Sequence, residues 1–121
     1  MMVLVDTSIW IDHFKRGNTS LEKLLLDMKV ICHPFIIGEL ACDNLKNRKE
    51  ILSLLHSLPA APLLEHDEVL YFIESKKLMG IGIGLIDVHL LASAHLAHAL
   101  LWTIDKKLLN VSDVLGISYS I

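Results

Sequence analysis

Four acidic residues at the edges of apolar segments constrain this chain more than any other feature. They are Asp6, Glu39, Asp87 and Asp105, and they are spread over 121 residues. Carboxylates are seldom placed within buried apolar chain unless they are paired or bind a metal. A fold that joins these segments would therefore build a compact negative pocket suited to a hard divalent cation. Such a pocket indicates metal-assisted chemistry on phosphate esters.

Short apolar runs alternate with segments of helical periodicity. This order predicts an α/β fold with a mostly parallel central sheet flanked by helices. Buried parallel strands are expected at 2–6, 30–32 and 100–103, and shorter strands at 63–64 and 117–121. Helices are expected over 9–14, 19–28, a segment that begins at Pro34, 48–58, 67–79, 85–99 and 105–109. Sites in such sheets lie beyond the carboxyl ends of the strands, where Asp6 and Asp105 would sit.

The composition fits a single domain over residues 1–121. A hydrophobic content of 53% is enough for a packed core. No apolar run is long enough to span a bilayer, and we expect no signal peptide, which predicts a cytoplasmic protein without membrane contact. Cys32 and Cys42 have neither redox nor zinc spacing, so reduced thiols are expected. The formal net charge of −3 argues against a protein that coats nucleic acid electrostatically, but it leaves a nuclease open.

Four segments carry a resemblance to a known family. They are Asp6-Thr-Ser-Ile-Trp-Ile-Asp12, Gly38-Glu-Leu-Ala-Cys42, Gly84-Leu-Ile-Asp-Val-His-Leu-Leu-Ala-Ser-Ala94 and Leu101-Trp-Thr-Ile-Asp-Lys-Lys-Leu108. In this order, over the whole chain, they resemble the PIN-domain ribonucleases, most closely the VapC-type toxins of bacterial toxin–antitoxin modules. The resemblance implies a PIN-like domain that uses Mg²⁺, with Mn²⁺ as a substitute, to hydrolyse structured RNA such as tRNA or ribosomal RNA.

The resemblance also assigns roles to individual residues. Asp6, Glu39, Asp87 and Asp105 correspond to the acidic quartet that binds metal and is catalytic in this family. The hydroxyl residues that support such a pocket correspond to Thr7 or Ser8 and to Thr103. One departure is Asp43, where a glycine is common, and we expect its side chain to face solvent.

Two kinds of protein partner are implied by the same resemblance. A small antitoxin is expected to cover the acidic pocket with its C-terminal segment. A homodimer is also expected, because proteins of this family often pair through helical surfaces. The helix over 67–79, with Leu70, Tyr71, Ile73 and Leu78, is a candidate for that contact, although it could equally be core.

Binding of a divalent cation by this set of acids also has a physical basis that is independent of the resemblance. Mg²⁺ prefers oxygen ligands and keeps several waters, so a few carboxylates suffice. Asp6, Glu39 and Asp87 would hold the main ion directly or through water, with Asp105 in support. Whether one ion or two act stays open. Without a cation the four charges would repel one another and raise at least one pKa.

Each acid also has a purely structural interpretation. Asp6 and Asp105 could cap helices, Glu39 could pair with Lys46 or Arg48, and Asp87 could favour a helix N-terminus. Taken together, the four structural interpretations explain the set of acids poorly. Glu39 and Asp87 lie among Ile and Leu residues, where a solvated acid is not expected.

Other functions remain as alternatives. The enzymatic alternative is a PIN-like nuclease of RNA processing without an antitoxin. The others are a non-catalytic PIN-like binding module and, more weakly, a receiver-type signalling domain. The spacing of the seven histidines does not support a zinc site. His89, close to Asp87, could contact substrate, but a surface position is expected. Trp10 and Trp102 are expected in the core.

Overall fold

The strands form a three-stranded parallel sheet in the order β2–β1–β3 in this computed structural model, which describes residues 1–121. They are β1 (Val3–Val5), β2 (Val30–Ile31) and β3 (Leu100–Trp102). Val3 of the central strand pairs with Val30 on one side and with Leu100 on the other. Nearly every strand residue is buried, as expected for a parallel sheet that is covered on both faces. The predicted α/β class is confirmed.

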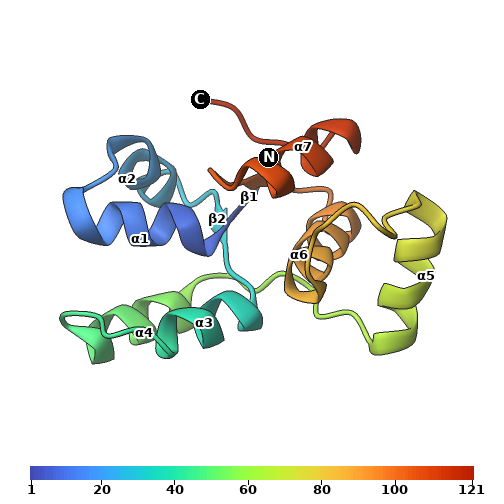
Figure 1. Cartoon of the computed structure of the whole chain (residues 1–121). Coiled ribbons are helices and arrows are strands. Elements are labelled where there is room, and N and C mark those ends of the chain that lie inside the picture. Colours follow the sequence, from blue (N-terminus) through green and yellow to red (C-terminus); the bar gives the residue numbers. More distant parts are fainter.

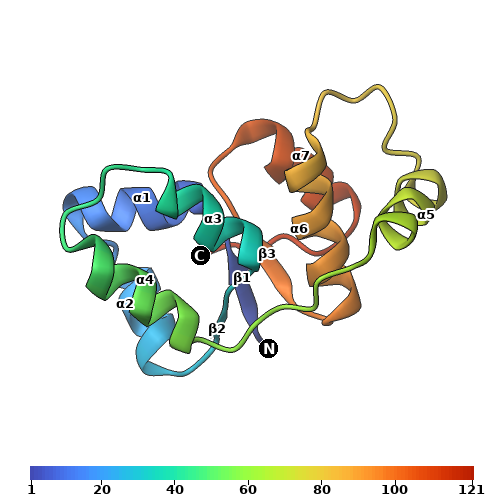
Figure 2. The same cartoon turned by 90° about the horizontal axis from the view of Figure 1, so that it is seen from below.

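Seven helices surround this sheet. They are α1 (Thr7–Arg16), α2 (Thr19–Leu26), α3 (Pro34–Ala41), α4 (Arg48–Ser57), α5 (His66–Lys76), α6 (Leu85–Leu96) and α7 (Lys106–Val114). In both views α1 to α4 lie to one side of the strands and α5 and α6 lie to the other (Figures 1 and 2). One cluster of 26 buried apolar residues joins the strands to the helices. None of the helices has the length and hydropathy that a bilayer-spanning segment needs.

Helix α6 is the most deeply buried helix. All seven residues from Val88 to Ala94 are buried, and the helix packs against α5, β1 and β3. It begins after Gly84, which places Asp87 in its first turn. It ends at Leu96, three residues before the predicted end, because His98 adopts a left-handed backbone with φ of 53°. The central position of α6 fixes Asp87 relative to the sheet.

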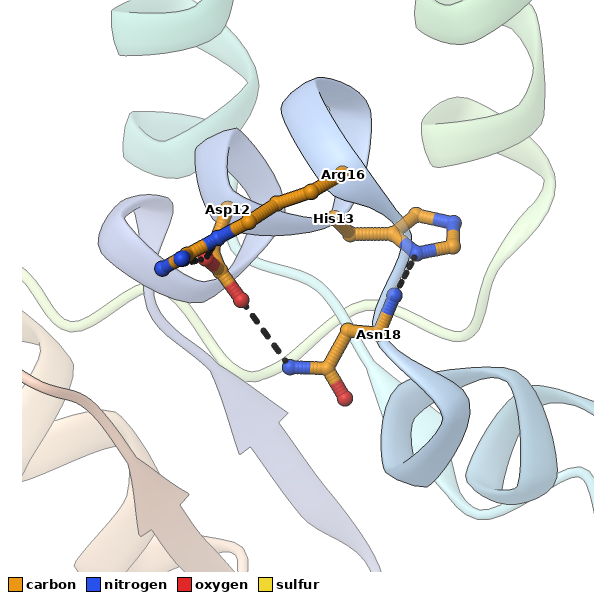
Figure 3. A network of polar contacts seen from close by, with 4 residues as sticks. All are labelled: Asp12, His13, Arg16 and Asn18. Carbon is orange, nitrogen blue, oxygen red and sulfur yellow. Dashed lines mark hydrogen bonds and ion pairs between the residues drawn. The ribbon is translucent and has the colours of Figure 1, made fainter.

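The turn from α1 to α2 is held by a polar network (Figure 3). Arg16 donates to Asp12 at 2.7 Å, and the Asn18 side chain donates to the other oxygen of Asp12 at 3.3 Å. The hydrogen bond from Arg16 lowers the pKa of Asp12 below its ordinary value. Gly17 has φ of 74°, a conformation that glycine adopts without strain, and it ends α1 as predicted. Asp12 therefore has a structural role at this turn.

Two predicted strands are not formed. The segment 63–64 is irregular, and the chain meets the sheet edge earlier, through a single bridge between Cys32 and Ala60. Pro59 and Pro62 flank this contact and have no N–H group to extend a ladder. The segment 117–121 likewise makes only one bridge, between Ser118 and Leu101. Helix boundaries also differ by a few residues, and α7 extends to Val114 rather than stopping near 109.

The two tryptophans lie in the core, as predicted. Trp10 is fully buried and Trp102 is 4% exposed. The predicted solvent position of Asp43 is also confirmed, because this residue is exposed beyond the end of α3.

Candidate active site

Asp6 and Thr103 lie side by side where β1 and β3 end. The pairing of Val5 with Trp102 carries these next two residues to the same edge of the sheet. The Asp6 N–H donates to the Trp102 carbonyl at 2.9 Å. Asp6 Oδ2 accepts one hydrogen bond from Thr103 Oγ1 at 2.7 Å and another from Ser8 Oγ at 2.8 Å. Two hydroxyl groups thus fix one oxygen of a carboxylate that is only 7% exposed.

Asp6 occupies the N-cap position of α1, but its side chain does not cap the helix. The carboxylate makes no hydrogen bond to the first-turn N–H groups. It is directed to Ser8 and Thr103 instead. The capping interpretation of Asp6 is therefore not supported.

Asp105 does cap a helix. Its Oδ1 accepts from the Leu108 N–H at 3.0 Å, at the start of α7. Its own N–H donates to Thr103 Oγ1 at 3.0 Å, and the neighbouring Ile104 N–H donates to Ser8 Oγ at 3.2 Å. The loop between β3 and α7 is consequently held to the end of β1 by the hydroxyl groups of Ser8 and Thr103.

Glu39 reaches the same region from α3. Thr7 Oγ1 donates to Glu39 Oε1 at 2.7 Å. This hydrogen bond connects the start of α1 to α3. Glu39 is exposed, so the expectation of an apolar environment was wrong for this residue: its neighbours Ile36 and Leu40 point into the core while Glu39 points out. It also forms no ion pair with Lys46 or Arg48, because the only ion pair of the chain joins Arg16 to Asp12.

Asp87 links all four acids electrostatically. Partial burial raises the pKa of the Asp87 carboxyl above its ordinary value. The negative charges of three other acids raise it further, in the order Asp6, Asp105 and Glu39. Four segments that are distant in the sequence therefore contribute to one negative pocket, and no lysine or arginine forms an ion pair with any of its acids.

The donor set of this pocket fits Mg²⁺ or Mn²⁺ better than it fits zinc. It consists of carboxylate and hydroxyl oxygens, which are the ligands that hard cations prefer. No three acidic, histidine or cysteine side chains converge closely enough to ligate one ion together. The raised pKa of Asp87 is compatible with this lack of a converged ligand set, because charge repulsion acts over longer distances than ligation. An ion in this pocket would be bound by few carboxylates and would keep several waters, as Mg²⁺ commonly does.

Two histidines, His33 and His89, lie buried where α3 meets α6. The Phe35 N–H donates to His33 Nδ1 at 3.0 Å, so Nε2 carries the proton and donates to Ser93 Oγ at 3.1 Å. Burial, with a smaller contribution from His89, lowers the pKa of His33 to about 4. His89 is only 7% exposed, and the expected surface position was wrong. It lies on the face of α6 that meets α3, which the amphipathic pattern of such an apolar helix does not reveal.

A cavity next to Glu39 was not anticipated from the motifs. Its volume is about 480 Å³. It is lined by Pro34, Phe35, Gly38, Glu39, Cys42, Leu85, Ile86 and His89. The signal that could have indicated it is spacing: Phe35 and Glu39 are one helical turn apart, as are Leu85 and His89.

A parallel α/β domain with acids beyond the carboxyl ends of two strands fits the class of PIN-like nuclease domains. The chain is 44% identical over 108 residues to ribonuclease VapC32 of Mycobacterium tuberculosis, in both strain CDC 1551 / Oshkosh and strain ATCC 25618 / H37Rv. This match covers 88% of the chain and 87% of the relative. No family model matches the chain. At this identity and coverage, the chain belongs to the VapC-type family of PIN-domain ribonuclease toxins.

Proposed function

We propose that this chain is a Mg²⁺-dependent endoribonuclease toxin that hydrolyses phosphodiester bonds in structured RNA, such as tRNA or ribosomal RNA, in the cytoplasm. The observation that carries the proposal is the hydrogen-bonded arrangement of Asp6, Ser8, Thr103 and Asp105 beyond β1 and β3, and the raised pKa of Asp87 agrees with it. The likeness to a ribonuclease over most of the chain supports RNA as the substrate class.

The proposal gives each acid a role toward the cation. Asp6, Glu39 and Asp87 would hold the main ion, at least one of them through water, and Asp105 would support it. A bound divalent cation activates water and neutralises charge on the phosphate group. Ser8 and Thr103 orient the Asp6 carboxylate, and Thr7 orients Glu39. Such outer contacts typically change metal affinity or activity about 10- to 100-fold when they are removed.

The proposal is tested by cleavage of labelled total tRNA and ribosomal RNA by the purified protein. Reactions contain Mg²⁺, Mn²⁺ or EDTA, and the variants are Asp6→Asn and Asp87→Asn. Asp27→Asn is the matched control, because Asp27 is an exposed residue at the end of α2, outside the pocket. We expect discrete fragments from the parent protein and from Asp27→Asn, only with metal, and none from the two pocket variants. Absence of both cleavage and Mn²⁺ binding in folded protein would contradict the proposal and favour a binding module.

We further propose that a cognate antitoxin inhibits the enzyme. The uncompensated negative charge of the pocket offers a site for a basic segment of such a partner. Growth arrest on expression of the chain, relieved by the product of a small neighbouring gene, would support this partner. Growth without arrest, despite RNA cleavage by the purified protein, would favour a role in RNA processing instead.

A homodimer through α5 is also part of the proposal. Leu70 is 45% exposed and Tyr71 is 75% exposed, so both are free to contact a second copy. Leu78 is 7% exposed and therefore belongs to the core rather than to this surface. Sedimentation of the parent protein as a dimer and of Tyr71→Glu as a monomer is the expected result. A monomeric parent protein would contradict it.

A further inference from the structure

The cavity between α3 and α6 has apolar walls that are open to solvent. Leu85 is 53% exposed and Ile86 is 39% exposed, although both are large apolar side chains. On the α3 side Phe35 is half-buried, and its ring meets the His89 ring edge to face, with centroids 4.7 Å apart. The volume of about 480 Å³ is within the range of small-ligand sites.

One polar side chain in this cavity has no partner. His89 is more than nine-tenths buried, and its Nδ1 atom makes no hydrogen bond and is shielded from water. Buried polar groups are nearly always hydrogen-bonded, and a turn of the His89 ring that brings Nδ1 to the cavity would let a bound group supply the missing partner. The neighbouring His33 is different, because both of its ring nitrogens have partners.

The position and charge of the cavity restrict what can fill it. Glu39 belongs both to its wall and to the acidic pocket, so the occupant lies next to the site of phosphate chemistry. No lysine or arginine lines it, and Glu39 is negative, so a neutral group fits this cavity better than a phosphate group does. A neutral group with a flat face and a hydrogen-bonding edge fits an aromatic wall and an unpaired imidazole, and a nucleobase has both features.

We propose that this cavity is a nucleobase subsite: it holds the base of a nucleotide next to the cleaved bond, against Phe35, with His89 as the hydrogen-bonding partner of the base edge. The inference rests on the proposed cleavage of RNA and adds a selective contact to it. It predicts that the enzyme prefers certain bases at one position beside the cut.

Two variants test the subsite without disturbing the fold. Gly38→Leu fills the cavity, because a Cβ atom at this helical glycine meets no other atom within 4 Å and the backbone is not left-handed. His89→Phe keeps an aromatic ring against Phe35 but removes both ring nitrogens. Ser53→Leu adds the same side chain as the first variant at an exposed site on α4, and it serves as the control. Thermal unfolding confirms that each variant is folded.

The measurements are cleavage of an RNA pool with randomised sequence, followed by sequencing of the cut ends, and binding of AMP, CMP, GMP and UMP with Mn²⁺. The parent protein and Ser53→Leu are expected to prefer certain bases at one position and to bind one mononucleotide most tightly. In Gly38→Leu and His89→Phe we expect the preference to flatten, and the KM and the mononucleotide Kd to rise about tenfold or more.

The possible failures are distinguishable. Metal-dependent cleavage with the same base preference in all variants would overturn the subsite and leave the proposed function intact. Unchanged cleavage with lost inhibition by the antitoxin would overturn it too, by assigning the cavity to a protein. Without any cleavage by the parent protein, the proposed function fails, and the mononucleotide arm alone decides whether the cavity binds a base.

Discussion

Thr103 illustrates how one hydroxyl group can organise two acids. It donates to Asp6 Oδ2 and accepts from the Asp105 N–H, while its side chain is 4% exposed. A buried hydroxyl that donates to a carboxylate fixes the orientation of that carboxylate. The precision of the negative pocket therefore depends on a residue that carries no charge.

Thr103→Val should separate this positioning role from simple packing. The substitution keeps the shape but leaves the Asp105 N–H unpaired, and it should lower the free energy of unfolding by about 1–3 kcal/mol. RNA cleavage should fall about 10- to 100-fold, and half-saturation should need more Mn²⁺. Denaturant unfolding and a metal titration of cleavage measure both effects. Thr103→Ser retains the hydroxyl group and should restore most of the metal affinity; equal losses in both variants would contradict the role.

Asp105 allows the charge of a side chain to be separated from its capping role. Asn and Asp cap helices about equally well, whereas Ala costs about 1 kcal/mol. Asp105→Asn should therefore keep the stability of the metal-free protein, but weaken Mn²⁺ binding and cleavage. Asp105→Ala should lose stability as well as Mn²⁺ binding and cleavage. Calorimetric unfolding without metal, together with Mn²⁺ titration, distinguishes them, and full metal affinity in Asp105→Asn would limit Asp105 to capping.

At the scale of elements, α3 and α6 are joined through a buried hydrogen bond between His33 and Ser93. The same His33 ring also accepts from the Phe35 N–H, and so it caps the start of α3. These contacts fix the relative position of the two helices that carry Glu39 and Asp87. They require a neutral imidazole, because Nδ1 acts as an acceptor.

This requirement predicts a dependence of stability on pH. The pKa of His33 is about 4 in the folded protein, below its ordinary value of 6.5. Between these values the unfolded chain binds a proton that the folded protein does not, so the stability present above pH 6.5 is lost as the pH falls toward 4. The contribution of His33 is about 3 kcal/mol at most.

Urea unfolding at pH 7, 5.5 and 4.5 measures this loss. His56→Gln, at an exposed site on α4, is the control that should keep the same dependence. A free energy of unfolding that stays constant over this range would show that His33 becomes charged without cost.

At the scale of the whole molecule, the negative pocket joins four segments that the chain connects only through its fold. Asp6 and Asp105 follow strands, while Glu39 and Asp87 lie on α3 and α6, two helices that meet through His33 and Ser93. Because their charges raise the pKa of Asp87, bringing them together without a cation opposes folding. A bound cation should therefore stabilise the whole structure.

Addition of Mn²⁺ should raise the melting temperature, and EDTA should reverse the change. At a concentration of 100 times the Kd, binding adds about 2.7 kcal/mol. For a chain of this size that corresponds to a shift of roughly 10 °C. Differential scanning fluorimetry measures it, with Asp27→Asn as a variant that keeps the shift and Asp87→Asn as one that reduces it. An unchanged melting temperature would count against a metal site.

The sequence by itself determined the α/β class, the three buried strands and the approximate helices. Local patterns encode these features: the short apolar run Val3–Val5 before a polar turn favours a buried strand, and Gly17 ends a helix. The family resemblance of the four acidic segments predicted which residues would form the site. Local patterns wrongly predicted a strand over 117–121. This segment forms only one bridge to β3, because strand formation there depends on pairing with a distant part of the chain.

Only the tertiary structure decided how the site is built. Which face of a helix is buried depends on the neighbours that pack against it, so His89 lies inside and Glu39 outside, each contrary to its local sequence. The hydroxyl contacts of Thr103 with Asp6 and of Thr7 with Glu39 join residues 97 and 32 positions apart. Interactions of that range leave no periodic signal in a single sequence, because they arise only when strand register and helix packing are fixed together.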